Sequence, residues 1–357
     1  MGAAAEPKVI LVTGGAGFIG SHLVDHLTAR GDQVINVDAL TYAGRLENLA
    51  DLKGNARHVF VQGSITDTAL VLRLLVAHKA VALVHLAAES HVDRSIERPA
   101  DFITTNIVGT YALLEAARRY WEPLSTREKS AFRFVHVSTD EVFGSVAIGA
   151  SREGDPYRPN SPYAASKASS DHLVRAYHST FGLPTVVTNG SNTFGPRQFP
   201  EKLIPTMILS AIDGHALPVY GDGLNVRDWL FVEDHARAIA AVMDRGQPGE
   251  SYNVGAENGH TNIEVVHAVC DSLNRLRPRA DGLSYSDQIA FVADRPGHDR
   301  RYALDSSKLR SALSWRSANS FAHCLERTVR WYLNHEQWWR PLKDPTRGFH
   351  RIGLTAD

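Results

Sequence analysis

The sequence predicts an α/β protein, in which a doubly wound parallel sheet is joined to a smaller, mixed α/β substrate-binding domain. Three observations lead to this fold class. Short apolar runs alternate with helical patterns through the first half of the 357-residue chain, a glycine-rich turn follows the first apolar run, and Pro- and Gly-rich loops surround shorter elements after residue 189. Strands that alternate with helices form right-handed crossovers, which cover both faces of a parallel sheet.

Each apolar run in the first half has the length of a buried strand, and most are separated from the next by a helical pattern. The expected strands are Val9–Thr13, Gln33–Val37, His58–Gln62, Ala80–Leu86, Phe134–Val137 and Pro184–Thr188. The expected helices are Ser21–Ala29, 68–78, 101–120 and 164–181. A sheet of this kind binds its ligands at the carboxyl ends of its strands, so the functional residues are expected at that edge.

The first strand is followed directly by Gly14, Gly17 and Gly20, which open the first helix. Glycine permits the tight turn, lets the backbone approach a pyrophosphate and packs the helix close to the strand. Asp38 follows the second expected strand, where a carboxylate accepts hydrogen bonds from the ribose hydroxyls of adenosine. The same carboxylate would repel a 2′-phosphate. The pattern therefore predicts a Rossmann-type site for NAD rather than NADP.

The domain boundary is expected close to residue 189. Residues 7–189 form the expected NAD-binding domain, and residues 190–345 form mainly the sugar-nucleotide-binding domain implied by the resemblance described below. Phe231–Met243 has the pattern of a strand followed by a helix. Residues 228–247 are therefore expected to return to the first domain.

Tyr163 and Lys167 are four residues apart on an expected helix, so they share one helical face. The preceding Pro159-Asn160-Ser161-Pro162 turn fits the start of that helix. A free tyrosine has a pKa of about 10, and a nearby ammonium favours the phenolate. The pair therefore predicts a base that operates near neutral pH.

Together, the glycine motif and the Tyr/Lys pair resemble the extended short-chain dehydrogenase/reductase superfamily. In that superfamily the tyrosine acts as base on a substrate hydroxyl while a hydride passes between substrate and nicotinamide, and a Ser or Thr usually ends the fifth strand. Here the region contains Thr139-Asp140-Glu141. Epimerases of the superfamily usually carry small or neutral residues after the Ser or Thr. The two carboxylates instead resemble those of the nucleoside-diphosphate-sugar 4,6-dehydratases.

The resemblance covers residues from about 8 to 340. It includes the stretches Leu86–Ser95, Ser161–His172, Phe199–Pro205, Arg227–Leu230, Val232–Arg237 and Asp294–Arg301. The sequence departs from the family pattern at Ser64, Gly190, Thr193 and Phe194, none of which belongs to the catalytic set. The resemblance favours dTDP-glucose as the substrate. A dehydratase of another sugar nucleotide, such as a UDP-sugar, and a non-catalytic NAD-binding scaffold stay open, and an epimerase is the weaker enzymatic alternative.

The resemblance implies a role for each site residue. Tyr163 takes the proton of the sugar 4-hydroxyl, Lys167 supports Tyr163 and the nicotinamide ribose, and Thr139 binds the 4-oxygen. Glu141 removes the C5 proton, while a protonated Asp140 donates to the departing 6-hydroxyl. The expected cofactor-binding residues are Gly14, Gly17, Phe18, Ile19, Gly20, Asp38, Ser64, Ile65, Leu86, Ala87, Ala88, Tyr163 and Lys167. The expected substrate-binding residues are Ser90, Thr139, Asn192, Lys202, Leu203, Pro218, Tyr220, Arg227, Asn262, Arg295 and His298.

The sequence allows two interpretations of Asn106. It resembles a residue that supports the active site in this superfamily, but a role as a helix cap or as a surface residue fits the pattern equally well. Arg227 likewise either binds the substrate pyrophosphate or forms a surface ion pair with Asp228 or Glu233.

The composition limits the classes of partner that the chain is expected to bind. The 38 Lys and Arg residues and 39 Asp and Glu residues give a net charge of −1, which favours neither nucleic acid nor a membrane surface as a partner. The two cysteines, the absence of a signal-peptide pattern and the absence of a metal-ligand motif predict a cytoplasmic protein without a metal. The expected helices 101–120 and 164–181 carry apolar residues on more than one face: Ile103, Ile107, Leu113, Leu114, Leu173, Val174, Tyr177 and Phe181. A helix with two apolar faces must bury both, and the resemblance implies a homodimer joined by a four-helix bundle.

Overall fold

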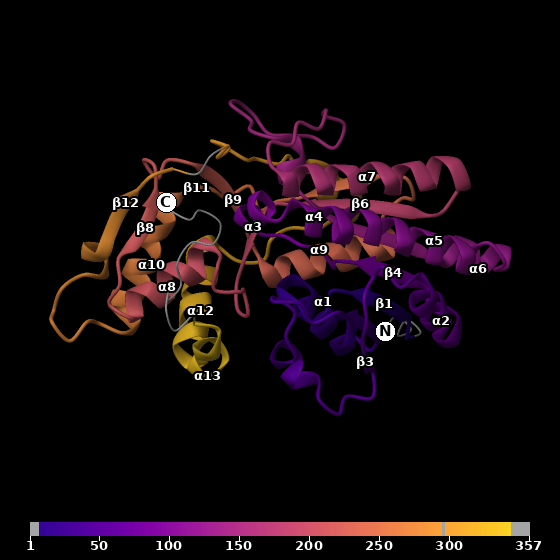
Figure 1. Cartoon of the computed structure of the whole chain (residues 1–357), viewed down its shortest axis with the longest axis horizontal. Coiled ribbons are helices and arrows are strands. Elements are labelled where there is room, and N and C mark those ends of the chain that lie inside the picture. The colour runs from indigo at the N-terminus through magenta and orange to yellow at the C-terminus, as the bar shows by residue number, and fades with distance from the viewer. Residues whose placement is uncertain (1–6, 295–296, 344–357) are drawn as a thin grey trace.

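Seven parallel strands form the main sheet, in the order β10-β6-β5-β4-β1-β2-β3. The structure is a computed structural model and describes residues 7–294 and 297–343 (Figure 1). The strands are β1 Val9–Thr13, β2 Gln33–Asp38, β3 His58–Gln62, β4 Ala82–His85, β5 Arg133–Thr139, β6 Thr185–Gly190 and β10 Ser251–Val254. The six predicted strands and the doubly wound α/β class are confirmed. β10 was not predicted, because Ser251-Tyr-Asn-Val254 is short and only half apolar.

Helices cover both faces of this sheet. Apolar side chains of α1 (Phe18–Ala29), α9 (Val232–Arg245) and α11 (Ser307–Leu313) share one core with alternate strand residues such as Ile10 and Val12. Those of α2 (Thr68–His78), α5 (Gly109–Trp121) and α7 (Pro162–Phe181) share a second core with residues such as Leu11. Residues 228–247 therefore contribute a helix that packs directly against α1.

The stretch predicted as one helix over 101–120 is interrupted, so that prediction is wrong in detail. The structure has α4 Pro99–Phe102, a π-helix over Ile103–Val108 and then α5. The wider turn contains Asn106, whose backbone oxygen accepts hydrogen bonds from Thr110 Oγ1 and Ser170 Oγ, each at 2.6 Å. π-Turns inside helices occur frequently at functional sites, where they place a side chain that a regular helix would not.

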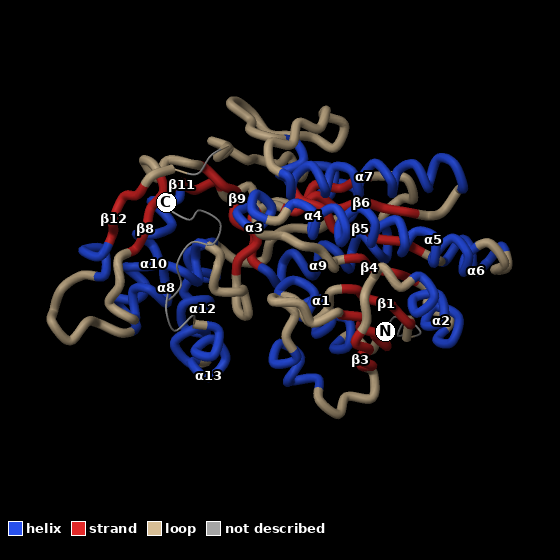
Figure 2. Tube along the Cα trace, viewed as in Figure 1, coloured by secondary structure: helices blue, strands red, loops and turns tan. Residues whose placement is uncertain are grey.

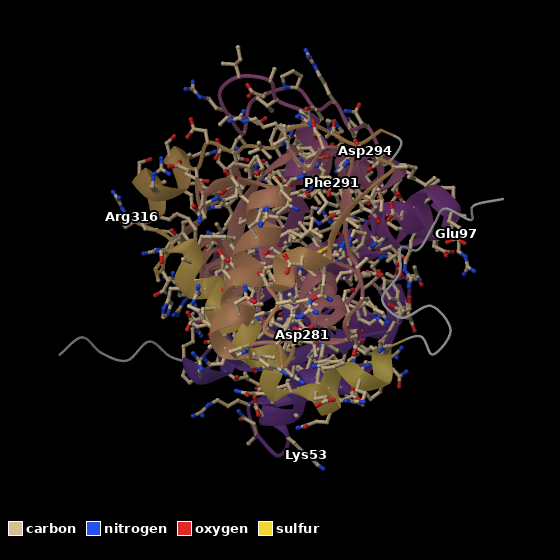
Figure 3. The ribbon with its side chains drawn as sticks, turned by 90° about the vertical axis from the view of Figure 1, so that its left-hand side faces the viewer. Lys53, Glu97, Asp281, Phe291, Asp294 and Arg316 are labelled. Carbon is tan, nitrogen blue, oxygen red and sulfur yellow. The ribbon has the colours of Figure 1, made fainter. Side chains whose placement is uncertain are left out.

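A second lobe is built from the C-terminal half (Figure 2). Its strands form the sheets β11-β9-β7 and β12-β8, from β7 Asn192–Phe194, β8 Leu217–Tyr220, β9 Val226–Phe231, β11 Gly259–Thr261 and β12 Ile289–Val292. A separate apolar core joins them to α8 Leu203–Ile212, α10 Asn262–Leu276, α12 Phe321–Asn334 and α13 Glu336–Trp339. Figure 3 views the molecule from this side, where Phe291 of β12 is exposed.

The remaining elements are short. They are the helices α3 Val92–Glu97 and α6 Thr126–Ala131 and the 3₁₀ turns Leu46–Leu52, Asp140–Phe143, Tyr285–Gln288 and Arg340–Leu342. Both Cys270 and Cys324 are buried and unpaired. Across the described residues, no helix combines the length and the apolar character that crossing a membrane requires. Among the same residues, no group of His, Cys, Asp and Glu side chains has an arrangement that could hold a metal ion.

Candidate active site

The glycine loop between β1 and α1 lies against the loop that follows β4. Gly14 has φ +74°, and a Cβ at this position would lie 2.5 Å from Ala87 N. A Cβ at Gly20 would lie 2.1 Å from Gly14 O, so the start of α1 packs directly on the turn. Gly17 caps α1 without a side-chain hydrogen bond, and Phe18 and Ile19 form the first turn. The backbone N–H groups of that turn can therefore receive an anion such as a pyrophosphate.

Asp38 is the last residue of β2, at the carboxyl end of the strand next to β1. Its carboxylate accepts hydrogen bonds from Ala16 N at 2.9 Å and from Leu40 N at 2.8 Å, which fixes it beside the glycine loop. Burial raises the pKa of Asp38, and the two backbone donors oppose this rise. Each oxygen keeps a lone pair that a ribose hydroxyl can use.

The other predicted cofactor residues follow the neighbouring strands. Ser64 and Ile65 follow β3 after one residue, Gly63, and Leu86, Ala87 and Ala88 come directly after β4. Because adjacent parallel strands end at the same edge, the structure brings these segments to one side of the sheet. These features fit a dinucleotide such as NAD. Its pyrophosphate would lie at the glycine turn and the free backbone N–H groups that begin α1, and its adenosine ribose would lie at the Asp38 carboxylate.

The end of β5 carries the predicted acid pair. Thr139 is the last residue of the strand, and Asp140 and Glu141 begin a 3₁₀ turn. The Thr139 hydroxyl accepts a hydrogen bond from Glu141 N at 3.3 Å and donates one to Asp140 Oδ1 at 3.2 Å. Asp140 is buried, and its Oδ2 has no hydrogen-bond partner among the described residues. Burial, followed by the charge of Glu141, raises the pKa of Asp140 to about 8.

Tyr163 and Lys167 lie on the first turns of α7, which Ser161 caps by accepting a hydrogen bond from Ala164 N at 3.0 Å. The side chain of Tyr163 hydrogen-bonds with that of Thr139, so α7 and the end of β5 meet at this point. Lys167 Nζ donates to Val137 O at 2.8 Å. Burial lowers the pKa of Lys167 to about 8.

One electrostatic expectation from the sequence is wrong. Lys167 was expected to lower the pKa of Tyr163, but the pKa of Tyr163 is raised, first by burial and then by the charge of Glu141. The hydrogen bond from Lys167 goes to the backbone of β5. In this structure it is the hydrogen bond with Thr139 that favours the phenolate of Tyr163.

Asn106 connects two parts of the site. It is buried in the π-turn, donates to Ser166 Oγ on α7 at 2.8 Å, and both donates to Glu89 O and accepts from Glu89 N after β4. The interpretation of Asn106 as a surface residue is therefore wrong. The interpretation as a helix cap is also wrong, because Asn106 lies within the π-helix and not at the end of a helix.

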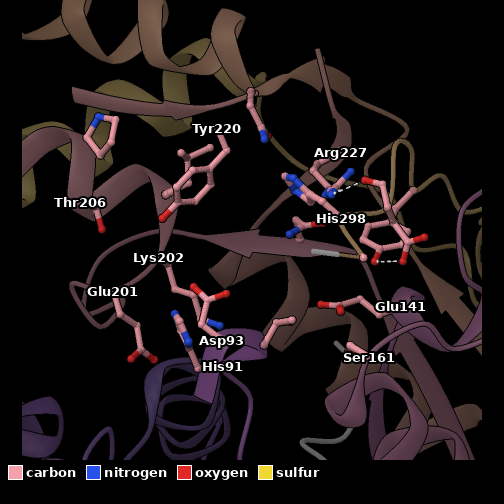
Figure 4. Close-up of a pocket in the computed structure, with 18 of the residues that line it drawn as sticks. His91, Asp93, Glu141, Ser161, Glu201, Lys202, Thr206, Tyr220, Arg227 and His298 are labelled. Carbon is pink, nitrogen blue, oxygen red and sulfur yellow. Dashed lines mark hydrogen bonds between the residues drawn. The ribbon is translucent and has the colours of Figure 1, made fainter. Parts of the chain in front are cut away.

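A cavity lies between Glu141 and the second lobe (Figure 4), and Asp140 is not part of its lining. Glu141 and Ser161 border one side, Arg227 and His298 lie beside them, and Tyr220 stands at the opposite side. The predicted substrate residues that line it are Asn192, Lys202, Leu203, Pro218, Tyr220, Arg227, Asn262 and His298. Ser90 and Thr139 are not part of its lining, although Ser90 O accepts a hydrogen bond from Lys202 Nζ at 3.0 Å. Arg295 lies outside the described residues.

Arg227 is 7% exposed, so the surface ion pair with Asp228 or Glu233 is wrong. Its guanidinium donates to Asp299 O at 2.8 Å and lies over the ring of Tyr302, 4.3 Å from the ring centre. Glu233 instead pairs with Arg327. Arg227 therefore presents a cation to the cavity from a fixed position.

Several lining residues were not predicted, including Glu201, Trp229 and Tyr302. Glu201 accepts hydrogen bonds from Tyr42 Oη at 2.9 Å and from Arg94 Nε at 3.3 Å, and so joins the loop after β2 to the second lobe. Its position within the Phe199–Pro205 stretch was a usable signal. Tyr302 follows directly on the Asp294–Arg301 stretch, and only the fold reveals that its ring supports Arg227.

Three comparisons place this geometry among known proteins. The family model described as GDP-mannose 4,6 dehydratase matches residues 11–328. A curated dTDP-glucose 4,6-dehydratase of Xanthomonas campestris pv. campestris strain B100 is 57% identical over 347 residues, which cover 97% of this chain and 99% of the relative. A dTDP-glucose 4,6-dehydratase of Escherichia coli is 52% identical, again over 97% of this chain and 99% of the relative.

Solved structures show the same fold. The dTDP-glucose 4,6-dehydratase DesIV from Streptomyces venezuelae, solved with NAD bound, aligns with a TM-score of 0.86 at 47% identity, covering 94% of this chain and 100% of that one. A UDP-glucose 4-epimerase from Thermotoga maritima, solved with UDP-glucose, aligns with a TM-score of 0.81 at 31% identity, covering 92% and 99%. Dehydratases and epimerases therefore share this architecture, and the side chains at the site have to distinguish them.

Proposed function

The chain belongs to the GDP-mannose 4,6-dehydratase family, and on that basis we propose that it is an NAD-dependent hydro-lyase that converts dTDP-glucose to dTDP-4-keto-6-deoxyglucose. The observation that carries the reaction type is the acid pair Asp140-Glu141, held at the end of β5 next to Tyr163. An epimerase, which loses no water, has no use for an acid and a base at C6 and C5. The substrate follows from the curated dTDP-glucose 4,6-dehydratases, which match over nearly the whole chain.

The first chemical step is oxidation at C4 of the sugar. The chemistry that NAD supplies when bound is reversible hydride transfer, first from C4 and later to C6. Tyr163 Oη takes the proton of the 4-hydroxyl, and Thr139 Oγ1 donates a hydrogen bond to the developing 4-ketone. Lys167 Nζ, one turn from Tyr163 on α7, is assigned to the nicotinamide ribose and, once the dinucleotide is bound, to support of the Tyr163 phenolate. The glycine loop and Asp38 hold the dinucleotide in register with these groups.

The ketone acidifies the C5 proton and so permits elimination. Glu141 removes that proton, while Asp140 donates its own proton to the 6-oxygen, which leaves as water. Asp140 can act as an acid near neutral pH because its pKa is about 8. After hydride returns to C6, Glu141 gives a proton back to C5. Tyr163 then releases to solvent the proton that it took from the 4-hydroxyl, and Asp140 takes one up from solvent. The sugar nucleotide loses one water, and the cofactor ends in its starting oxidation state.

The pH dependence separates Asp140 from Lys167. We expect elimination to slow as pH rises through about 8, because Asp140 loses the proton that it must donate. Reduced cofactor then accumulates during turnover, and its near-ultraviolet absorbance rises with pH. Loss of the Lys167 proton slows the earlier oxidation and lowers the same absorbance. Because Lys167 also has a pKa of about 8, the two groups are separated in single turnovers, where the rise of reduced cofactor reports oxidation and its decay reports elimination. A decay rate that does not fall as pH rises through about 8 contradicts the role of Asp140.

The nucleotide diphosphate is bound by the second lobe in this proposal. Lys202, Arg227 and His298, which line the cavity, face the pyrophosphate. Asn192, Leu203, Pro218, Tyr220 and Asn262 contact the rest of the nucleotide and sugar. Ser90, in the loop after β4, holds Lys202 through its backbone oxygen.

Arg227→Ala is expected to raise KM for dTDP-glucose by about 10- to 100-fold, since a charge-assisted hydrogen bond contributes about 1.5–3 kcal/mol. Because the group binds a part of the substrate that does not react, kcat should fall much less. Steady-state kinetics checks this, with the exposed Arg330→Ala as the matched control. A fall in kcat at unchanged KM would place Arg227 in the chemical step instead.

The function is tested by incubating the purified protein with dTDP-glucose in deuterated water and analysing the product by mass spectrometry. Loss of one water with one deuterium at C5 supports the proposal. If dTDP-glucose is unchanged and a UDP-sugar loses water, the chain is a dehydratase of another sugar nucleotide. If no sugar nucleotide reacts although NAD binds, the chain is a non-catalytic NAD-binding scaffold.

We also propose a homodimer, formed by α5 and α7 of two copies as a four-helix bundle. The apolar side chains exposed on this face are Ile103, Val108, Tyr111 and Phe181. Of the residues expected there from sequence, Leu113, Leu114, Val174 and Tyr177 instead face the core beneath. Light scattering at micromolar concentration should give twice the chain mass, and Val108→Asp should give monomers. A monomeric wild-type protein would contradict this arrangement.

In this proposal, residues 7–189 with the returning segment 228–247 bind the cofactor, and residues 190–345 mainly bind the nucleotide sugar. The protein acts in the cytoplasm, where the buried, unpaired Cys270 and Cys324 stay reduced. Neither a nucleic acid nor a membrane is needed for the reaction.

A further inference from the structure

Asp171 is a buried carboxylate that the proposed reaction does not use. It lies on α7 one turn beyond Lys167, which itself lies one turn beyond Tyr163, so the three side chains share one helical face. Asp171 and Lys167 are 0% and 4% exposed. A fully buried ionised carboxylate is costly unless it is paired and hydrogen-bonded, so its presence calls for a specific set of partners.

The partners of Asp171 join α7 to the strands that carry the acid pair. Its Oδ2 accepts hydrogen bonds from Ser138 Oγ at 2.9 Å, from Tyr157 Oη at 2.8 Å and from Asn189 Nδ2 at 3.3 Å. Its Oδ1 lies 3.2 Å from His136 Nε2. Ser138 directly precedes Thr139, so one carboxylate holds both catalytic segments, the end of β5 and the face of α7.

The titratable groups around Lys167 belong to β4, β5 and α7. On β4 and β5, burial lowers the pKa of His85 well below its ordinary value and that of His136 to about 4, so both rings are neutral near pH 7. On α7, the charge of Asp171 raises the pKa of Lys167 against the effect of burial. The remaining charged or titratable groups are Tyr163, which faces Asp140 and Glu141, and Arg175, which donates to Tyr157 Oη at 2.8 Å.

We propose that Asp171 is a positioning residue that holds Lys167 as a charged ammonium and fixes α7 against the end of β5. The inference rests on the proposed function only for the part that Lys167 plays in catalysis. Burial alone favours a neutral amine at Lys167, and the neighbouring histidines provide no negative charge. Asp171 supplies that charge, and its own charge is held by the hydroxyls, the amide and His136 around it.

The direct test is the titration of Lys167, followed by NMR of protein labelled with ¹⁵N-lysine. The Lys167 signal is assigned by its loss in Lys167→Arg. Asp171→Asn is expected to lower the pKa of Lys167 by about 1 to 3, because it removes an opposite charge that lies one turn along α7 in a buried site. The side-chain oxygen of Asn can still accept from Ser138, Tyr157 and Asn189, so this variant keeps those hydrogen bonds.

Two controls separate charge from structure. Tyr157→Phe removes one hydrogen bond to Asp171 but keeps the charge. Asp271→Asn makes the same chemical change at an exposed position of α10. Both should leave the titration of Lys167 in place. If Asp171 had only a structural role, the pKa of Lys167 would be the same in Asp171→Asn as in Tyr157→Phe. An unchanged Lys167 titration in folded Asp171→Asn overturns the proposal.

The consequence for catalysis is read from the first turnover. In a Glu141→Gln background, where elimination is blocked, Asp171→Asn should move the alkaline fall of C4 oxidation to lower pH by the same amount. If the wild-type protein does not consume dTDP-glucose, the proposed function fails, while the NMR titration still decides the role of Asp171. If Asp171→Asn does not fold, Asp171→Ser removes the same charge with a smaller side chain. In the wild-type protein itself, a Lys167 pKa well below about 8 would contradict the proposal without any variant.

Discussion

Glu141→Gln is expected to lower the rate of water loss from dTDP-glucose by about 10²- to 10⁴-fold, the usual contribution of a positioned base. Glutamine has nearly the same shape, so the turn at the end of β5 should be preserved while the C5 base is lost. Oxidation at C4 precedes this step and uses Tyr163 instead. Reduced cofactor should therefore accumulate, while no deuterium enters C5 in deuterated water.

Stopped-flow absorbance and mass spectrometry check both halves of this result. Glu122→Gln provides the matched control, because Glu122 forms only an exposed ion pair with Arg118 on the far end of α5. It should leave both rates unchanged. Deuterium at C5 at the wild-type rate in Glu141→Gln would assign the C5 base to another group.

The parts of the molecule that sequence predicts well are those set by local pattern and by the handedness of crossovers. Gly14, Gly17 and Gly20 are required by contacts within a few residues and with the adjacent β4 loop, so their spacing is readable. The parallel sheet with helices on both faces follows from the alternation of strands and helices and from right-handed connections. The two residues of the acid pair are adjacent in sequence, and Tyr163 and Lys167 are one helical turn apart. Each pair is therefore visible in the sequence, and the two pairs come together where the end of β5 meets α7.

What sequence does not reveal depends on contacts between distant segments. β10 completes the sheet by pairing with β6 rather than by its own apolar pattern. Tyr302 becomes part of the site only because it stacks on Arg227, and Glu201 because Tyr42 and Arg94 reach it. The apolar residues of α5 and α7 divide between core and surface according to packing, so their exposed members could not be chosen from periodicity alone. The raised pKa of Tyr163 likewise follows from burial, which a spacing of four residues does not report.

Tyr163→Phe is expected to stop the reaction earlier than Glu141→Gln does. Phenylalanine fills the same buried site but cannot accept the proton of the 4-hydroxyl, so C4 oxidation should fall by about 10²- to 10⁴-fold. Without the ketone, the C5 proton is not acidic enough for Glu141 to remove. Neither reduced cofactor nor deuterium at C5 should then appear from dTDP-glucose. The control Tyr120→Phe, at a buried tyrosine whose hydroxyl donates to Ala80 O away from the site, should keep both.

The product separates the two variants more sharply, because dTDP-4-keto-6-deoxyglucose already carries the ketone. When it is incubated in deuterated water, exchange at C5 needs Glu141 but does not need a base at the 4-hydroxyl. Tyr163→Phe should therefore retain this exchange, and Glu141→Gln should lose it. Equal loss in both variants would contradict the separate roles, because it would mean that Tyr163 and Glu141 act on the same proton.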